Sequence, residues 1–430
     1  MALWLNAKDR NFESAFSGLL ATKREVSEDV DQIVRDILSD VSARGDAALL
    51  DYTQKFDRFA LNAATLRISA GEIAAARAAC TPQALAALDV ARARILAFHQ
   101  RQIPQDMRFT DELGVELGWR WTAIEAVGLY VPGGTASYPS SVLMNAIPAK
   151  VAGCPRVVMV VPTPDGHINP LVLAAADLAG VDEIYRIGGA QAVAALAYGT
   201  QTIAPVAKIV GPGNAFVAAA KRRVFGTVGI DMIAGPSEVL IVADQNANPD
   251  WIAADLLAQA EHDTAAQSVL ITDDEPLAKA VEQAVERQLK TLPRAAIASA
   301  SWRDFGAIIL VPDIEAALPL IDRIAPEHLE LMVEHAESLV ARIRNAGAIF
   351  IGGHTPEAIG DYVGGSNHVL PTARSARFSS GLGVLDFMKR TSILKCSPES
   401  LRVLAPSAIA LGEAESLDAH ARSVSIRLNM

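Results

Sequence analysis

Apolar residues follow two different patterns along the chain. Over residues 26–56 and 70–101 they recur at helical spacing, and Gly45 interrupts the first of these regions. From residue 126 onward, short apolar runs of strand length alternate with longer helical segments. These patterns predict a helical N-terminal region followed by repeated strand–helix units.

The alternation forms two series. The first contains the predicted strands "AVGLYVPGG", "RVVMVVP", "EIYRIGG" and "KIVGPGN", each followed by a helical segment. The second runs through "EVLIVAD", "SVLITDD", "FGAIILVPD", "LELMV" and "GAIFIGG". Such alternation is typical of a parallel sheet with helices on both faces. We therefore predict an α/β fold with two Rossmann-like, doubly wound units and a tail, from Gly381 onward, that returns to a helix-like pattern.

One predicted helix carries polar groups on its apolar face. Asp250 is expected to cap its first turn, and Ile252 and Leu256 form the apolar face. At helical spacing the same face reaches Gln259 and His262, which lie three residues apart and are therefore suited to ligate one metal ion. A hydrogen-bonded amide and imidazole in the core explain the same pattern, and spacing alone favours that simpler interpretation.

Two further segments combine an acid with a histidine. Glu327 and His328 are adjacent, and an imidazole with a pKa near 6.5 is suited to accept a proton at neutral pH. A solvated loop pair explains these two residues equally well. The segment "GDYVGGSNHVLPT" (residues 360–372) places Asp361 and His368 around a glycine turn, and polar, glycine-rich loops of this kind usually line a site.

A glycine-rich turn, "GPGNAF" (residues 211–216), follows a predicted strand and begins a helix, as phosphate-binding turns do. Phe216 takes the place of the third glycine of G-x-G-x-x-G, so the turn taken alone favours an ordinary tight turn. Ligands of doubly wound sheets collect where strands end and helices begin. By this position Tyr130, Gln191 and Asn214 are candidate contacts.

Composition and charge narrow the class of protein. The chain has 430 residues, of which 51% are hydrophobic and 20% charged, so we expect an ordinary globular protein with more than one domain. The net charge of −11 argues against a nucleic-acid partner, and the basic run at residues 220–224 is expected to be a solvated helix face. We find no secretory leader and no apolar stretch of bilayer length, which predicts a cytoplasmic protein without a membrane partner.

The three cysteines, Cys80, Cys154 and Cys396, are far apart and form no CxxC pair. This sparse set predicts free thiols in a reducing compartment. A cysteine can act as a nucleophile when an acid or base lies beside it to activate the thiol. Because no acid or base motif lies beside Cys154, we expect that residue to be structural.

Eight segments, in order, carry a resemblance to a known family: "VGLYVPGG", "GGAQAVAALAYGT", "GPGNAFVAAAKR", "IDMIAGPSEVL", "DLLAQAEHD", "PEHLEL", "GDYVGGSNHVLPT" and "AHARSVSIRLN". Together they closely resemble histidinol dehydrogenases. The resemblance covers nearly the whole chain, and this ordered set is far more specific than any single motif.

The resemblance implies a zinc- and NAD-dependent homodimer that oxidises L-histidinol through L-histidinal to L-histidine, the last steps of histidine biosynthesis. It implies that Glu327 and His328 form the acid–base pair. The implied zinc ligands, the last of them from the partner subunit, are Gln259, His262, Asp361 and His420. The implied substrate contacts are Ser237, His328, Glu415 and the four metal ligands. The implied NAD contacts are Tyr130, Gln191 and Asn214.

The resemblance also implies a division of the chain into domains with different binding roles. We expect an N-terminal segment at residues 1–24 and a zinc- and substrate-binding domain formed by residues 25–129 and 237–381. Residues 130–236 are expected to form the NAD-binding domain. Residues 382–430 are expected to be a dimerising tail that contributes to the partner subunit's site.

The implied chemistry divides between the two residues of the acid–base pair. His328 is expected to take the alcohol proton, and Glu327 to activate the water needed for the aldehyde step. Two alternatives remain open at this point. One is a related zinc dehydrogenase of another amino alcohol or polyol, and the other is a non-enzymatic, two-lobed ligand-binding protein.

Overall fold

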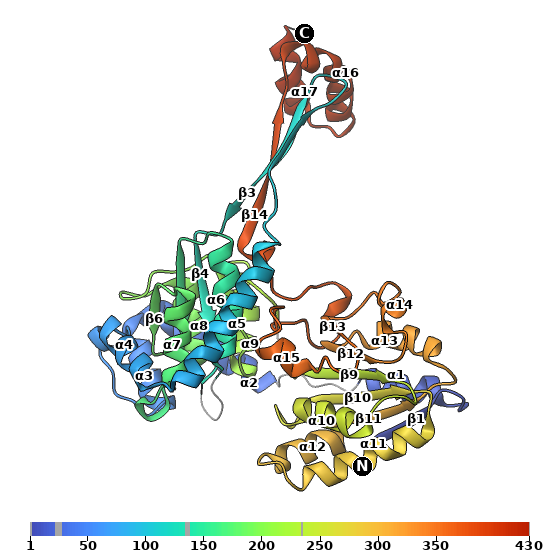
Figure 1. Cartoon of the computed structure of the whole chain (residues 1–430). Helices are drawn as coiled ribbons and strands as arrows, with labels where there is room; N and C mark the ends of the chain where they lie inside the picture. Colours follow the sequence, from blue (N-terminus) through green and yellow to red (C-terminus); the bar gives the residue numbers. More distant parts are fainter. Residues whose placement is uncertain (1, 22–27, 134–137, 234, 430) are drawn as a thin grey trace.

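The computed structural model describes residues 2–21, 28–133, 138–233 and 235–429. Within these ranges the strands form one six-stranded, one five-stranded and one three-stranded sheet. Figure 1 shows two α/β lobes and a long two-stranded ribbon that carries the C-terminal helices away from them. The predicted α/β class is therefore confirmed, and the third sheet is an addition to it.

The first lobe contains the five-stranded sheet, ordered β6–β5–β4–β7–β8, in which all neighbours are parallel. The chain starts at the central β4, adds β5 and β6 on one side and then β7 and β8 on the other. The strand order therefore reverses between β4 and β7, as in a doubly wound sheet. The strands are β4 (Ala126–Tyr130), β5 (Arg156–Val160), β6 (Glu183–Tyr185), β7 (Lys208–Val210) and β8 (Gly229–Ile230).

The second lobe contains the six-stranded sheet, ordered β1–β11–β10–β9–β12–β13 and also parallel throughout. Here the order reverses between β9 and β12. The strands are β1 (Leu3–Asn6), β9 (Glu238–Ala243), β10 (Gln267–Thr272), β11 (Ala307–Leu310), β12 (His328–Met332) and β13 (Ala348–Ile351).

Both faces of each large sheet are buried. On β9, Val239 and Ile241 join one apolar core, whereas Leu240 and Val242 join the core on the opposite face. Helices α10 (Pro249–Ala260), α11 (Glu275–Leu289) and α12 (Ala295–Phe305) cover the first face of this sheet. Helices α1 (Phe12–Ala21), α13 (Leu318–Ile324) and α14 (Ala336–Val340) cover the other. Continuous burial explains why these strands appear in the sequence as unbroken apolar runs.

The N-terminal region belongs to different lobes from those expected. Helix α2 packs against α8 and α9, and α5 packs against α6, so residues 28–100 cover the five-stranded sheet. The first residues instead supply β1 of the six-stranded sheet. The helices of the first lobe are α2 (Glu28–Arg44), α3 (Asp46–Phe56), α4 (Ala70–Ala79), α5 (Pro82–Gln100), α6 (Pro139–Val151), α7 (Pro170–Ala179), α8 (Gly189–Tyr198) and α9 (Ala215–Val224). An apolar helix face shows that a helix is covered, but not which sheet covers it, and our assignment of residues 25–129 to the second lobe therefore differs from the structure.

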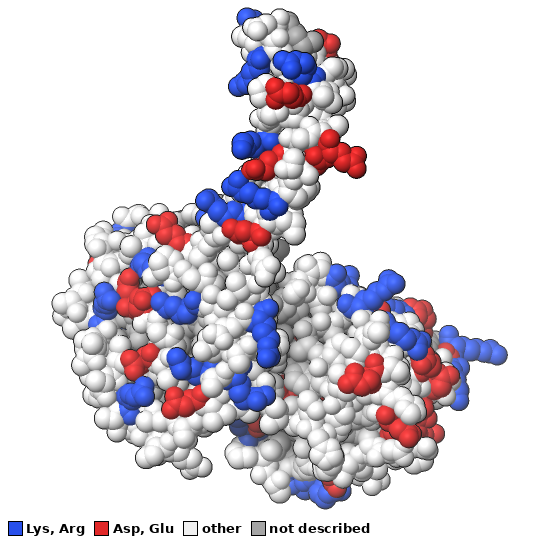
Figure 2. Space-filling view, turned by 45° about the horizontal axis from the view of Figure 1, so that its top comes forward, with Lys and Arg blue, Asp and Glu red and all other residues white. Residues whose placement is uncertain are grey.

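A projecting arm completes the fold (Figures 1 and 2). It consists of β2 (Met107–Thr110), β3 (Glu116–Ala123), β14 (Met388–Lys395), α16 (Pro398–Ala414) and α17 (Asp418–Ser425). Strand β14 pairs antiparallel with β3 along its whole length. The helix-like pattern expected from Gly381 onward is therefore wrong over β14, whose residues are exposed or half-buried and so lack the alternation that indicates a strand.

Among the described residues, no helix combines the length and the apolar content that crossing a bilayer requires. Cys80, Cys154 and Cys396 are free thiols, as the sequence predicted.

Candidate functional site

Helix α10 brings the first candidate ligand to the site. Asn248 caps it, because its side-chain oxygen accepts from the backbone N–H groups of Asp250 and Trp251. Asp250, the cap we expected, lies one residue inside the helix, because Pro249 is already helical. Ile252 and Leu256 are completely buried, as predicted, and they fix the helix against the sheet.

Gln259 and His262 end up in different environments. Gln259 is completely buried in the last turn of α10, and its Oε1 has no hydrogen-bond partner among the described residues. His262 lies two residues beyond the end of the helix and is exposed. The continuous buried stripe expected through His262 is therefore wrong, because the helix ends first. The exposed imidazole is free to turn toward the neighbouring element.

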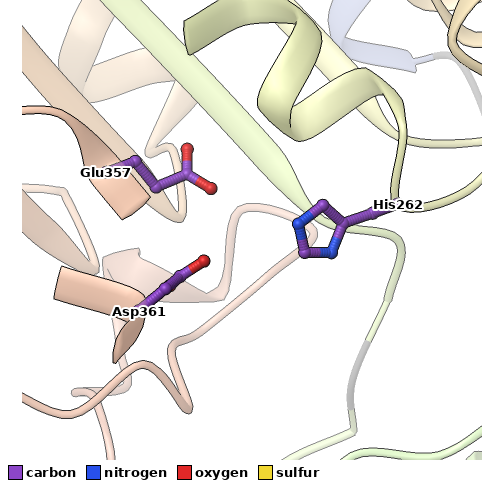
Figure 3. A group of neighbouring side chains, drawn as sticks. All are labelled: His262, Glu357 and Asp361. Carbon is purple, nitrogen blue, oxygen red and sulfur yellow. The ribbon is translucent and has the colours of Figure 1, made fainter. Parts of the chain in front are cut away.

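That element is the short helix α15 (Glu357–Tyr362), which follows β13. Glu357 and Asp361 are four residues apart and project from the same face. Figure 3 shows both carboxylates directed toward the His262 ring. One ligand atom from each of these three residues lies within 4.8 Å of the others. Glu357 was missed in the sequence, although its i, i+4 spacing to Asp361 was a usable signal.

His328 begins β12, next to this group. Its Nδ1 lies 3.0 Å from the backbone oxygen of Glu238. Because a carbonyl oxygen only accepts, we assign the ring proton to Nδ1, which leaves Nε2 with a free lone pair. The Gln259 side-chain nitrogen, 3.2 Å from the same Nδ1, is then a neighbouring donor and not a hydrogen-bond partner. Nε2 lies 3.8 Å from an Asp361 oxygen and has no hydrogen-bond partner within the described part of the chain. Burial lowers the pKa of His328 to about 4, so the ring is neutral at pH 7.

Glu327 and Ser237 lie at the same edge of the six-stranded sheet. The Glu327 carboxylate accepts from the backbone N–H of Glu238 at 2.9 Å and lies 3.7 Å from His328 Nδ1. Glu327 is only 5% exposed, so the solvated loop pair that the sequence left open is not what the structure has. Ser237 directly precedes β9, the neighbour of β12.

The group formed by His262, Glu357 and Asp361 fits a divalent metal ion such as zinc. Ligand atoms around tetrahedral zinc are about 3.4 Å apart, for bonds of about 2.1 Å. The observed separations, all within 4.8 Å, therefore need only a small contraction. The unpartnered Gln259 Oε1 is completely buried, and a buried polar atom without a partner costs about 1–3 kcal/mol unless something binds it. An imidazole and oxygen donors are ligands that zinc accepts.

Two expected site residues lie elsewhere. Glu415 follows the last residue of α16, and His420 lies on α17, both exposed in the projecting arm. Figure 1 places α16 and α17 at the far end of the β3–β14 ribbon, away from α10 and α15. Within one chain, Gln259 and Asp361 both lie beside His328, and Asp361 groups with His262, whereas His420 lies on the arm.

The candidate NAD contacts lie on the other lobe, at the carboxyl ends of its strands. Tyr130 ends β4, and its hydroxyl accepts from the N–H of Gly189 at 3.0 Å. Gln191, in the first turn of α8, is 2% exposed, and its Oε1 has no partner among the residues described. Asn214 is exposed and caps α9 through its side-chain oxygen. A cofactor would therefore meet the amide nitrogen of Asn214 while this cap holds.

The turn before Asn214 is held rigidly. Gly211 has φ +110°, and a Cβ there would lie 2.1 Å from the Tyr130 backbone oxygen, so only glycine fits. The Lys221 ammonium donates to the Gly211 oxygen at 2.9 Å and also to the Asp231 carboxylate. Asp231 in turn accepts from the Gly211 N–H at 2.7 Å. Lys221 is 2% exposed, so the solvated face expected for residues 220–224 is wrong at this position.

One histidine connects the two lobes. His368 Nδ1 lies 2.9 Å from the backbone oxygen of Asp361, and its Nε2 lies 3.2 Å from the hydroxyl of Ser141. Ser141 is in the first turn of α6, at the carboxyl end of β4. The two candidate sites are therefore neighbours, although they belong to different sheets.

The architecture and this arrangement define a two-domain α/β protein with a group of side chains that could hold a metal ion, beside the junction of its domains. Comparison with known proteins is more specific. A family model described as histidinol dehydrogenase matches residues 20–428. The chain is 72% identical to histidinol dehydrogenase of Mesorhizobium japonicum and 70% identical to that of Bradyrhizobium diazoefficiens, each over 430 residues and 100% of both chains.

The three-dimensional structure is also similar to that of a histidinol dehydrogenase. The crystal structure of histidinol dehydrogenase from Elizabethkingia anophelis matches with a TM-score of 0.95 and 38% identity, covering 100% of this chain and 98% of that one. The chain belongs to the histidinol dehydrogenase family. It is therefore an oxidoreductase, and the alternative of a non-enzymatic binding protein is set aside.

Proposed function

We propose that this protein catalyses the zinc- and NAD-dependent oxidation of L-histidinol to L-histidine through L-histidinal, in the cytoplasm and as a homodimer. The observation that supports this best is that Gln259 and Asp361 both lie beside the neutral base His328, while Asp361 also groups with His262 and Glu357. Family membership and the identity of about 70% to relatives named histidinol dehydrogenase support the choice of substrate.

The proposed metal site needs a second subunit. Gln259, His262 and Asp361 would hold zinc from one chain, and the partner subunit's His420 would complete the four ligands. The projecting arm supports this arrangement, because it exposes large apolar side chains of a kind that dimers bury. They include Met107, Phe109, Leu394, Val403, Leu411 and Ile426, each at least 48% exposed.

The substrate would lie between the metal ligands and His328. Zinc, when bound, would hold the amine and an imidazole nitrogen of histidinol and so fix the orientation of the reacting carbon. Ser237 and the partner subunit's Glu415 would bind the rest of the substrate. His328 Nε2, unprotonated and directed at this space, would take the hydroxyl proton as hydride leaves the carbon for NAD.

The second oxidation needs water, because an aldehyde can lose another hydride only after hydration. Glu327 would take a proton from the water that adds to the carbonyl, and the resulting gem-diol would give a second hydride to a second NAD. Tyr130, Gln191 and Asn214 are the proposed NAD contacts. Ser141 supports a short path between the two sites, because it contacts His368, which contacts Asp361.

The stoichiometry of the reaction tests the proposal. We expect two NADH per L-histidinol consumed, loss of turnover with a chelator, and recovery when zinc is added back. One NADH per substrate would indicate a simple alcohol dehydrogenase instead. A panel of other amino alcohols and polyols, assayed in parallel, tests the related-substrate alternative, which a higher kcat/KM for one of them would favour.

The division of roles has its own test. Glu327→Gln removes the base but keeps a similar shape, so we expect L-histidinal oxidation to fall by about 100-fold or more, within the usual range for general-base loss. Alcohol oxidation, followed in single-turnover experiments, should fall much less. An equal loss in both steps would count against this division.

A further inference from the structure

The elements that carry the proposed metal ligands are joined by three carboxyl groups that lie outside the proposed set of four ligands. Asp255 lies on α10, four residues before Gln259. Glu330 lies on β12, two residues after His328. Glu357 begins α15, four residues before Asp361. Each is therefore one helical turn, or one strand repeat, from a residue of the candidate site and faces the same way.

These three positions are connected by hydrogen bonds. One Glu330 oxygen accepts from the backbone N–H of Glu357 at 2.7 Å. The Glu330 carboxyl also lies within hydrogen-bonding reach of the Asp255 carboxyl, so the two can share a hydrogen bond when one of them is protonated. Glu330 is 1% exposed and Glu357 is 2% exposed, whereas Asp255 is half-buried. These contacts therefore form a bridge from Asp255 on α10, through Glu330 on β12, to the first turn of α15.

The contact to Glu357 fixes where α15 begins. Pro356 precedes the helix and supplies no side-chain cap, so the first N–H groups of α15 need an acceptor from elsewhere. Glu330 provides it from the adjacent strand. A helix of six residues has little stability of its own, so an external anchor at its first turn determines the direction of Asp361.

We propose that Asp255 and Glu330 are positioning residues that hold α10, β12 and α15 at the spacing required by the metal ligands. The inference rests on the proposed function, because it assigns these residues a role toward the zinc site. They act through Gln259, His328 and Asp361 and touch neither substrate nor cofactor. Outer-shell partners of this kind usually change metal affinity by 10–100-fold when they are removed.

The proposal also explains why acids occupy these positions. Burial raises the pKa of Glu330 to about 8 and that of Asp255 to about 6, so a proton can be shared between the two carboxyl groups. A shared proton allows two acids to bond to each other without like-charge repulsion. Glutamine preserves both an acceptor and a donor at position 330, whereas alanine preserves neither.

The test compares zinc affinity in the full-length protein by competition with a chromophoric chelator. Glu330→Ala should weaken zinc binding by 10–100-fold, and Glu330→Gln should restore it to within about threefold of wild type. The matched control is Glu282→Ala. It removes the acceptor of the Trp4 indole N–H in the same lobe but lies on α11, which carries none of the proposed ligands.

A second readout separates positioning from general damage. Cobalt-substituted protein absorbs visible light with a spectrum set by ligand geometry, so Glu330→Ala should shift this spectrum while Glu330→Gln and Glu282→Ala leave it unchanged. Asp255→Ala cuts the bridge at its half-buried end and serves as the test variant when Glu330→Ala does not fold. Its expected loss of affinity is several-fold.

The outcomes distinguish the two proposals. Wild-type protein that binds no zinc overturns the proposed function and this inference with it. Wild-type protein that binds zinc, with Glu330→Ala or its substitute Asp255→Ala showing unchanged affinity and an unchanged cobalt spectrum, overturns the positioning role alone. Failure of Glu330→Gln to restore binding also overturns it, because the hydrogen bonds would then not be the cause.

Discussion

The two lobes have the same architecture but present opposite edges to their junction. In the five-stranded lobe, Tyr130 ends β4, and Asn214 follows the carboxyl end of β7. In the six-stranded lobe, Ser237 and His328 lie at the amino ends of β9 and β12. Doubly wound sheets usually bind ligands at their carboxyl ends, so only the first lobe follows the rule.

The second lobe departs from the rule because helices return the chain to the amino edge. Helix α10 follows β9 and runs back along the sheet, so its last turn delivers Gln259 beside the start of β12. The two edges also differ in how their polar groups are satisfied. Lys221 and Asp231 satisfy each other beneath the turn at Gly211, whereas Gln259 Oε1 and His328 Nε2 have no partners among the described residues. The first edge combines a rigid turn with one unpartnered acceptor among the described residues, Gln191 Oε1, whereas the second edge has two.

The largest effect is expected when a proposed metal ligand is removed from the second lobe. His262→Ala should lower turnover by about 1,000-fold, or about 4 kcal/mol, because it deletes a proposed metal ligand. It should barely change thermal stability, because His262 lies outside α10 and is exposed. NADH formation, zinc content and the thermal midpoint are measured together. His335→Ala, another exposed histidine of this lobe, is the control. Wild-type turnover in His262→Ala would remove the metal site as described.

The first lobe should show the reverse behaviour. Lys221→Met leaves Asp231 buried without its ion-pair partner, which costs about 3–5 kcal/mol of unfolding free energy. The turn at Gly211 should loosen, and NAD affinity should fall, while zinc affinity stays at the wild-type value. Urea unfolding and isothermal titration with NAD give these quantities. Arg222→Met, one residue further along α9 and exposed, should change neither. Equal weakening of zinc and NAD binding would show that the two edges do not act separately.

A smaller expected effect is a pH dependence of unfolding stability that arises in the second lobe. The pKa of Glu330 is raised by burial from 4.5 to about 8, so the folded protein holds a proton that the unfolded chain has lost between these values. The stabilisation that protonated Glu330 gives the folded protein is complete below pH 4.5 and disappears as the pH rises through 8. Metal-free wild type should therefore unfold more easily at pH 8.5 than at pH 5.5.

Glu330→Gln, which carries no titrating group, should lose less stability over the same range. Thermal midpoints at the two pH values, with Glu334→Gln as the exposed control on the same segment, give the comparison. A pH dependence in Glu330→Gln identical to that of wild type would contradict the assignment of a raised pKa to Glu330.

The sequence predicted the periodic parts of the fold and the local parts of the site. Runs such as "EVLIVAD" are buried on both faces and so were recognised as strands, whereas β14 has neither face covered and was missed. Spacing related Gln259 to His262, but nothing in a sequence shows that α15 ends opposite α10. Lys221 illustrates a related limit: its place in a basic run predicted exposure, and its ion pair with Asp231, ten residues further along the chain, makes burial possible. Pairings between residues far apart in the chain depend on packing, which periodicity does not encode.

The Cys154 thiol is the group through which the first lobe could contribute covalent chemistry. Cys154, between α6 and β5, is 3% exposed, and its thiol contacts the backbone oxygen of Phe387 at 3.7 Å. Burial raises the pKa of Cys154 to about 11, whereas a nucleophilic cysteine needs its thiolate at neutral pH. Cys154→Ala should therefore keep turnover within about twofold and cost only about 1 kcal/mol of stability, for one buried atom removed. Cys80→Ala is the half-buried control. A large loss of L-histidinal oxidation in a stably folded Cys154→Ala variant would mean that the thiol takes part in the aldehyde step, and that the first lobe does more than hold a cofactor.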